Sequence, residues 1–185
     1  MCLHQKEETK MNLPNKLTVA RVIMVPFFIV LYMMGYTLPA FIIFVVAAFT
    51  DLLDGQIARK YNMVTNFGKI MDPLADKILV YSAFCCMVEN GLIPAWMLIV
   101  ILSREFIVGG MRTVAASEGI VIAAGMSGKI KTVLQMIAVP MLLLVGVIQQ
   151  PFWITASYVL LWASLIMTVY SGVEYILKNK GVFTQ

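Results

Sequence analysis

The sequence predicts an all-α, polytopic membrane protein with six transmembrane helices and a short N-terminal cytoplasmic arm. Of its 185 residues, 61% are hydrophobic and only 13% are charged. Soluble domains contain about 25% charged residues, and a soluble fold of this size cannot hide so much apolar surface. The mean hydropathy of +0.87 agrees, so lipid is the expected solvent for most of the chain.

Six apolar stretches are separated by short polar breaks, and each is close to the roughly 20 residues that cross a bilayer as a helix. Proline stands at three of the expected starts, as Pro39, Pro94 and Pro151. Proline suits the first turn of a helix, where its missing N–H is not needed. The six expected spans are Leu17–Gly35, Leu38–Arg59, Lys69–Glu89, Pro94–Ala115, Lys129–Ile148 and Phe152–Leu177.

The basic residues set the expected orientation. None of the 14 Lys and Arg residues lies in the alternate loops Gly35–Pro39, Glu89–Pro94 and Ile148–Phe152. Cytoplasmic segments carry an excess of these residues, so both termini are expected on the cytoplasmic side of the cell membrane. The expected organisation is an arm over residues 1–16, a six-helix domain over 17–178 and a cytoplasmic tail over 179–185. This topology, together with anionic substrates, accounts for the net charge of +4 without a nucleic-acid partner.

Four aspartates lie on two expected helices joined by a short loop: Asp51, Asp54, Asp72 and Asp76. Spacings of three and four residues put each pair on one helix face. Asp51 lies about two turns before the expected end of its helix, and Asp76 lies about two turns after the expected start of the next helix. The four carboxylates can therefore meet at one depth, just inside the cytoplasmic leaflet.

Carboxylates at that depth need partners. One interpretation is ion pairing with the cations nearby in the sequence, Arg59, Lys60, Lys69 and Lys77. Four mutually repelling carboxylates favour another, in which their oxygens bind hard divalent cations such as Mg²⁺ or Mn²⁺. Two such cations about 4 Å apart suit displacement at phosphorus.

Small and basic residues accompany the acids. Gly55 and Ala58 would let a flat base or a sugar approach the backbone, although small pairs of this kind also serve helix packing. Arg59 follows at the expected helix end, where its fork of donors could reach a diphosphate.

Written in order, Asp51-x-x-Asp54-Gly55-x-x-Ala58-Arg59, eight residues, Gly68-x-x-x-Asp72-x-x-x-Asp76 resembles the full signature of the CDP-alcohol phosphatidyltransferase family. The resemblance implies six transmembrane helices, two divalent cations, and transfer of a phosphatidyl group from a CDP-linked donor with release of CMP. Flanking segments resemble the bacterial phosphatidylglycerophosphate synthases of that family, which implies CDP-diacylglycerol as donor and glycerol 3-phosphate as acceptor. These segments are Asn12-Leu-Pro-Asn15-Lys-Leu-Thr18-x-x-Arg21, Ser103-Arg104-Glu105-Phe, Gly110-x-Arg112 and Gly128-Lys129-x-Lys131-Thr132-x-x-Gln135.

The resemblance also implies a role for each matching residue. The metal ligands would be Asp51, Asp54, Asp72 and Asp76, and Asp76 would also be the general base that accepts the proton of the acceptor hydroxyl. The cytidine nucleotide would be held by Thr18, Gly55, Ala58 and Arg59. The family is commonly homodimeric.

The acceptor carries its own phosphate, so a basic pocket is expected near the metals. Its candidate residues are Arg112, Lys129, Arg104 and Lys131, because arginine forks and lysines bind phosphate. Two alternatives stay open: Arg104 could pair with the neighbouring Glu105, and Lys131 could contact lipid headgroups.

Other functions are also compatible with acids in a membrane. Within the same family the acceptor could differ, as in cardiolipin, phosphatidylserine or phosphatidylinositol phosphate synthases. An intramembrane prenyltransferase would have two distant Asp-rich motifs in a longer chain, whereas all four acids here fall between Asp51 and Asp76. A cation transporter would have acids at mid-membrane and internal repeats. Stabilisation by CMP-containing ligands favours the transferase, and metal-dependent ion flux favours the transporter.

Overall fold

The computed structural model describes residues 13–60, 66–123 and 125–183, with side chains over these ranges except 13–14, 51–60, 66–67, 69–70 and 182–183. Over these residues all regular secondary structure is helical, and there is no strand. Six α-helices and one 3₁₀ helix follow in order: α1 (Leu13–Met33), α2 (Thr37–Lys60), α3 (Asn66–Glu89), α4 (Ala95–Ser117), α5 (Met126–Leu143), α6 (Pro151–Lys178) and η1 (Lys180–Phe183). The all-α prediction is confirmed.

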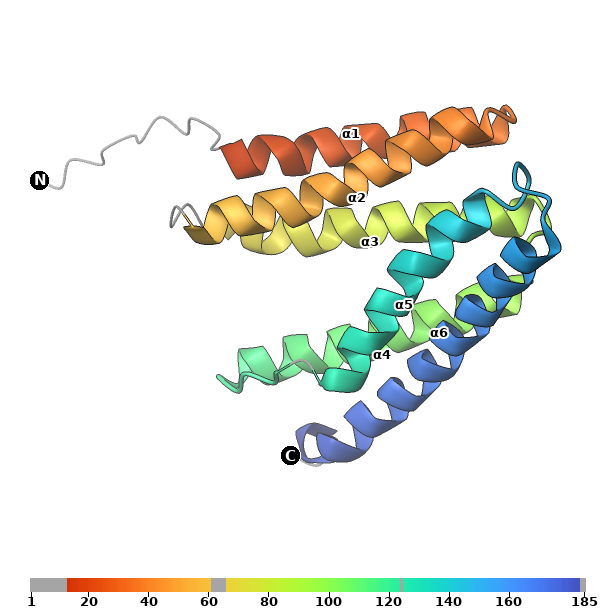
Figure 1. The fold of residues 1–185 in the computed structure, drawn as a ribbon. Coiled ribbons are helices and arrows are strands. Elements are labelled where there is room, and N and C mark those ends of the chain that lie inside the picture. Colours follow the sequence, from red (N-terminus) through yellow and green to blue (C-terminus); the bar gives the residue numbers. More distant parts are fainter. Residues whose placement is uncertain (1–12, 61–65, 124, 184–185) are drawn as a thin grey trace, which may run out of the picture.

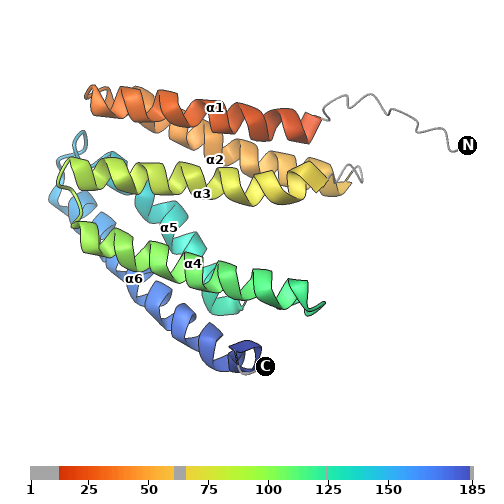
Figure 2. The same ribbon diagram turned by 180° about the vertical axis from the view of Figure 1, so that it is seen from behind.

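The helices form two groups that are also contiguous in the sequence (Figure 1). In the first group, α1 packs against α2 and α3; in the second, α6 packs against α5 and α4. Contacts between the groups are fewer and run from α5 to α2 and α3, and from α3 to α4. Figure 2 shows the same division from behind. A boundary therefore runs through the bundle between α3 on one side and α4 and α5 on the other.

Successive helices run in opposite directions, so the connections between them lie alternately at the two ends of the bundle. The α1–α2, α3–α4 and α5–α6 connections lie at one end, and the start of α1 and the end of α6 lie at the other (Figure 1). Gly35 and Gly91 make two of these tight connections with φ values of +83° and +69°. A side chain with a Cβ is strained at such angles, so glycine is needed where the chain reverses.

Aromatic side chains fill the first group of helices. Phe28, Phe44 and Phe84 are at most 1% exposed, and the ring centroids of Phe28 and Phe44 are 5.8 Å apart. The same cluster continues through Leu142 and Leu161 into α5 and α6. One apolar core therefore holds both groups together.

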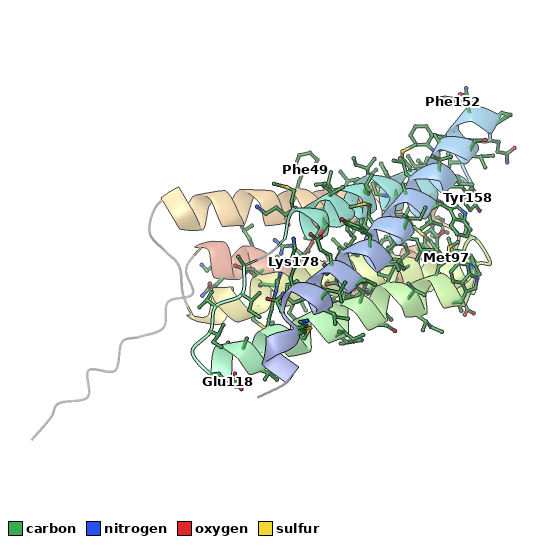
Figure 3. All side chains as sticks on the ribbon, turned by 90° about the horizontal axis from the view of Figure 1, so that it is seen from below. Phe49, Met97, Glu118, Phe152, Tyr158 and Lys178 are labelled. Atoms are coloured by element: carbon green, nitrogen blue, oxygen red, sulfur yellow. The ribbon has the colours of Figure 1, made fainter. Side chains whose placement is uncertain are left out.

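The outer surface is also apolar. Phe27, Phe106 and Phe152 are 61%, 74% and 81% exposed, and Figure 3 shows Phe152 at the opposite end of α6 from Lys178. Large exposed apolar surfaces indicate contact with lipid or with another protein. Two segments, Asn15–Met33 and Pro151–Lys178, are long and apolar enough by composition to cross a membrane. These features indicate a membrane protein.

Most predicted helix boundaries shift by a few residues, and one shifts more. The fifth span was expected to reach Ile148, but α5 ends at Leu143. Residues 144–147 form turns instead, in which the N–H of Val145 and of Val147 donate to carbonyls three residues earlier. Gly146 lies in this segment, and glycine weakens helix propagation. At the other end, α1 begins at Leu13 and not at Leu17.

Candidate active site

The aspartate segment lies toward the end of the bundle that holds the start of α1 and the end of α6. Asp51 lies nine residues before the end of α2, and Asp76 ten residues after the start of α3. At about 1.5 Å per residue, these positions are at similar depths on two helices that contact each other. The predicted convergence of depth is therefore supported by the backbone. The side chains of Asp51, Asp54, Gly55, Ala58 and Arg59 lie outside the described ones.

Asp72 is held by a hydroxyl group from α1. The Oγ1 atom of Thr18 donates a hydrogen bond to Asp72 Oδ1 at 2.5 Å, and Thr18 is completely buried. The sequence assigned Thr18 to the nucleotide, whereas the structure places its hydroxyl on a predicted metal ligand. A threonine in this position fixes the orientation of the carboxylate, as second-layer hydrogen bonds do in metal sites.

A buried arginine lies one turn further along α1. Arg21 is completely buried, and its Nε donates to the carbonyl of Ala47 on α2 at 3.2 Å. Thr18 and Arg21 thus connect α1 to both helices of the aspartate segment. The sequence offered a signal for Arg21, because an ionised side chain inside an apolar span indicates a functional position.

Asp76 borders a small polar cavity between the two groups of helices. Its volume is about 60 Å³, more than the roughly 10–15 Å³ that a cavity needs to hold one water molecule. The lining side chains come from α3, α4 and α5: Asp76, Lys77, Val80, Tyr81, Glu105, Lys131, Thr132, Gln135 and Met136. We call this the Asp76 cavity.

Glu105 is the central anion of the Asp76 cavity. It pairs with cations from three helices: Lys77 at 3.4 Å, Arg104 at 2.7 Å and Lys131 at 2.6 Å. The Glu105 and Lys131 side chains are only 11% and 4% exposed. The proposed pairing of Arg104 with Glu105 is confirmed. The lipid-headgroup alternative for Lys131 is wrong, because the ammonium group is buried against Glu105.

The Arg104 side chain also packs closely against two glycines, Gly128 and Gly172. A Cβ atom built on Gly128 would lie 3.0 Å from Arg104 Nη2, and one built on Gly172 would lie 3.0 Å from Arg104 Cγ. The Nε of Arg104 donates to Ser171 Oγ at 3.2 Å. The small residues of α5 and α6 therefore make room for the arginine, which explains glycine at both positions.

A second polar cavity, which Arg104 lines, has a volume of about 160 Å³. Ser127, Glu174 and Lys178 line it, together with Arg104. Ser127 donates a hydrogen bond to Glu174, which also pairs with Lys178 at 2.5 Å. Arg104 thus lines this second cavity and pairs with Glu105, which lines the Asp76 cavity.

The other two residues predicted to bind the acceptor phosphate lie apart from the Asp76 cavity. Arg112 is exposed on α4; its Nε donates to the Tyr175 hydroxyl at 3.2 Å, and its guanidinium lies 5.4 Å from the centre of that ring. Lys129 is exposed on the first turn of α5. No contact among the described side chains joins Arg112 to Lys129. Arg104 and Lys131 are the two predicted residues that meet, at Glu105.

Two of the four predicted metal ligands lie among the described side chains. Asp72 and Asp76 are one turn apart on α3, and their oxygens are the donors that hard divalent cations prefer. A carboxylate has enough lone pairs to accept the Thr18 hydrogen bond and still bind a cation. Among the described side chains no group of three His, Cys, Asp or Glu gathers; Asp51 and Asp54, which complete the predicted set, lie outside them.

Only Asp76 and Lys131 among the residues that line the Asp76 cavity were predicted site residues. Glu105 and Gln135 both occur in the flanking segments of the resemblance, but Glu105 was considered only as a partner of Arg104 and Gln135 received no role. A glutamate inside an apolar span was the available signal for Glu105. Gln135 is uncharged, and its place beside Asp76 depends on how α5 packs against α3.

Comparison with known proteins gives a consistent result. The sequence pattern of the CDP-alcohol phosphatidyltransferase family matches residues 11–170. A CDP-diacylglycerol–glycerol-3-phosphate 3-phosphatidyltransferase of Bacillus subtilis is 45% identical over 91% of this chain and 95% of its own length. The protein of that name in Rickettsia typhi is 36% identical over 93% and 99%. A probable phosphatidylglycerophosphate synthase of Mycobacterium tuberculosis is 37% identical over 89% and 80%. This chain belongs to the CDP-alcohol phosphatidyltransferase family.

Proposed function

We propose that this chain transfers the phosphatidyl group of CDP-diacylglycerol to glycerol 3-phosphate, giving phosphatidylglycerophosphate and CMP. The observation that carries the proposal is the match of nearly the whole chain to relatives named for this reaction, at up to 45% identity among those given above. The complete aspartate signature on α2 and α3 supplies the chemistry. The reaction is a step of phospholipid biosynthesis.

In the proposed mechanism, Asp51, Asp54, Asp72 and Asp76 hold two divalent cations, Mg²⁺ or Mn²⁺. When bound, such cations stabilise negative charge on the phosphoryl group and on the leaving CMP. Asp76 accepts the proton of the 1-hydroxyl of glycerol 3-phosphate. That oxygen forms a bond to the β-phosphorus of the donor as the bond from this phosphorus to the CMP oxygen breaks.

The remaining site residues bind the two substrates. Gly55, Ala58 and Arg59 hold the cytidine nucleotide, and Thr18 keeps Asp72 oriented beside it. The acceptor phosphate binds among Arg112, Lys129, Arg104 and Lys131. Support for this basic region comes from two of these residues. Lys131 lines the Asp76 cavity, and Arg104 pairs with Glu105, which lines it too. A homodimer is proposed from the family resemblance.

A panel of acceptors tests the proposed function. Purified protein with CDP-diacylglycerol and Mg²⁺ is expected to release CMP rapidly with glycerol 3-phosphate and to give phosphatidylglycerophosphate. Serine, inositol phosphate and phosphatidylglycerol are expected to give at most about a hundredth of that rate, because a site built for one set of polar groups rejects others strongly. Equal turnover with serine or phosphatidylglycerol would assign the chain to another activity of the family.

We further propose that all six helices cross the cell membrane, with both termini and the active site on the cytoplasmic side. Three connections without Lys or Arg at one end of the bundle support this orientation. In a cysteine-free background, Tyr36→Cys, Asn90→Cys and Gln149→Cys should react with an impermeant maleimide in intact cells. Glu118→Cys, at the other end, should react only after permeabilisation. The reverse pattern would invert the topology.

A further inference from the structure

The Asp76 cavity contains a polar group that the protein itself does not satisfy. Gln135 is 4% exposed, and its Nε2 is buried without a hydrogen-bond partner among the described residues. Buried polar atoms in native proteins are almost always hydrogen-bonded, and an exception calls for an explanation such as a missing ligand. Gln135 lines the same cavity as Asp76, so a ligand there would meet both side chains.

Neighbouring polar groups of the cavity are already engaged with protein. Lys131 and Lys77 pair with Glu105, and the hydroxyl of Thr132 donates to the carbonyl of Gly128 at 3.0 Å. The cavity is therefore organised around ion pairs, and Gln135 is the lining residue whose amide N–H has no partner among the described residues. A carboxamide N–H can donate a hydrogen bond to an uncharged hydroxyl oxygen, which can in turn donate to a neighbouring acceptor.

We propose that Gln135 recognises the 2-hydroxyl of the acceptor and thereby determines the preference for a vicinal diol phosphate. This inference rests on the proposed function: Asp76 takes the proton of the 1-hydroxyl, and the 2-hydroxyl is on the adjacent carbon. Both side chains line the Asp76 cavity, so an acceptor whose 1-hydroxyl meets Asp76 would bring its 2-hydroxyl to the region of Gln135. Gln135 is a specificity-determining residue in this assignment, and it takes no part in proton transfer.

The test compares two acceptors that differ by one oxygen atom, glycerol 3-phosphate and 3-hydroxypropyl phosphate, which lacks the 2-hydroxyl. The wild-type protein is expected to prefer glycerol 3-phosphate by about tenfold to a hundredfold in kcat/KM, because the analogue leaves a buried donor without a partner. Gln135→Met, similar in volume and apolar, is expected to reduce this preference to about twofold or less. The KM for CDP-diacylglycerol should not change.

Gln150→Met is the matched control, since Gln150 caps α6 without a side-chain hydrogen bond at the other end of the bundle. It should retain the wild-type preference. The inference is overturned if the wild-type protein uses both acceptors equally, a result that requires no variant to fold. It is also overturned if Gln135→Met or Gln135→Asn lowers kcat/KM equally for both acceptors. Absence of turnover with either acceptor in the wild-type protein would instead refute the proposed function.

Discussion

Replacing Asp76 by asparagine is expected to lower kcat by about 10²–10⁴-fold, the usual contribution of a positioned general base. Asparagine keeps the shape of the side chain but can neither accept the proton of the acceptor hydroxyl nor neutralise a cation. Asp51→Asn, Asp54→Asn and Asp72→Asn should reduce turnover comparably, because each removes a proposed metal ligand. CMP release at saturating Mg²⁺ measures these effects. Two or more variants with near-normal turnover would refute the two-metal proposal.

Thr18→Val is expected to have a smaller effect than the aspartate variants. It removes the hydrogen bond from Thr18 to Asp72 and leaves the carboxylate in place. Loss of an orienting hydrogen bond typically costs about 10–100-fold in metal affinity or activity, so the Mg²⁺ concentration for half-maximal activity should rise. Thr18→Ser, which keeps the hydroxyl, should stay near the wild-type value. A defect confined to the KM for CDP-diacylglycerol would favour the nucleotide role predicted from the sequence.

Glu105→Gln is expected to destabilise the protein by about 3–5 kcal/mol, since removing one partner of a buried ion pair leaves the other charge uncompensated. The groups that lose their carboxylate include Lys131 and Arg104, whose side chains are 4% and 13% exposed. For a chain of this length the thermal midpoint in detergent should fall by roughly 6–20 °C. Acceptor turnover should fall with it, because the same pair borders Asp76.

Two further variants isolate the cause. Glu174→Gln makes the same change at a pair whose lysine, Lys178, is 71% exposed, and exposed pairs contribute little; its midpoint should barely move. The double variant Glu105→Gln/Lys131→Met also removes the most buried of the three cations and should recover part of the lost stability, since Arg104 still lacks its carboxylate. Equal shifts for Glu105→Gln and Glu174→Gln would show that Glu105 is not the anchor of the cavity.

The helices and the position of the aspartates could be predicted from sequence because they depend on local pattern. Apolar stretches of spanning length, and acids three or four residues apart, are properties of one helix or of two helices in succession. The hydroxyl of Thr18 on Asp72 and the Glu105–Lys131 pair depend on contacts 54 and 26 residues apart in the chain. No periodicity encodes which side chains meet at such distances.

Arg104 and Lys131 illustrate the limit. Both were predicted to bind phosphate because arginine and lysine commonly do, and the structure places both on Glu105. Basic character alone does not tell that both cations pair with the same buried carboxylate, since that pairing depends on how the helices pack. The early end of α5 at Leu143 has a similar origin, because hydropathy continues past a point where the backbone turns.

The division of the bundle into two contiguous groups of helices has a consequence for biogenesis. A nascent chain folds from its N-terminus as it is made, so α1, α2 and α3 can associate, and Thr18 can reach Asp72, before α5 exists. The Asp76 cavity needs Glu105 and Lys131 as well. A truncated or stalled chain would therefore contain the aspartates without the walls of the cavity, and catalytic competence arrives only when the second half of the protein docks in the membrane.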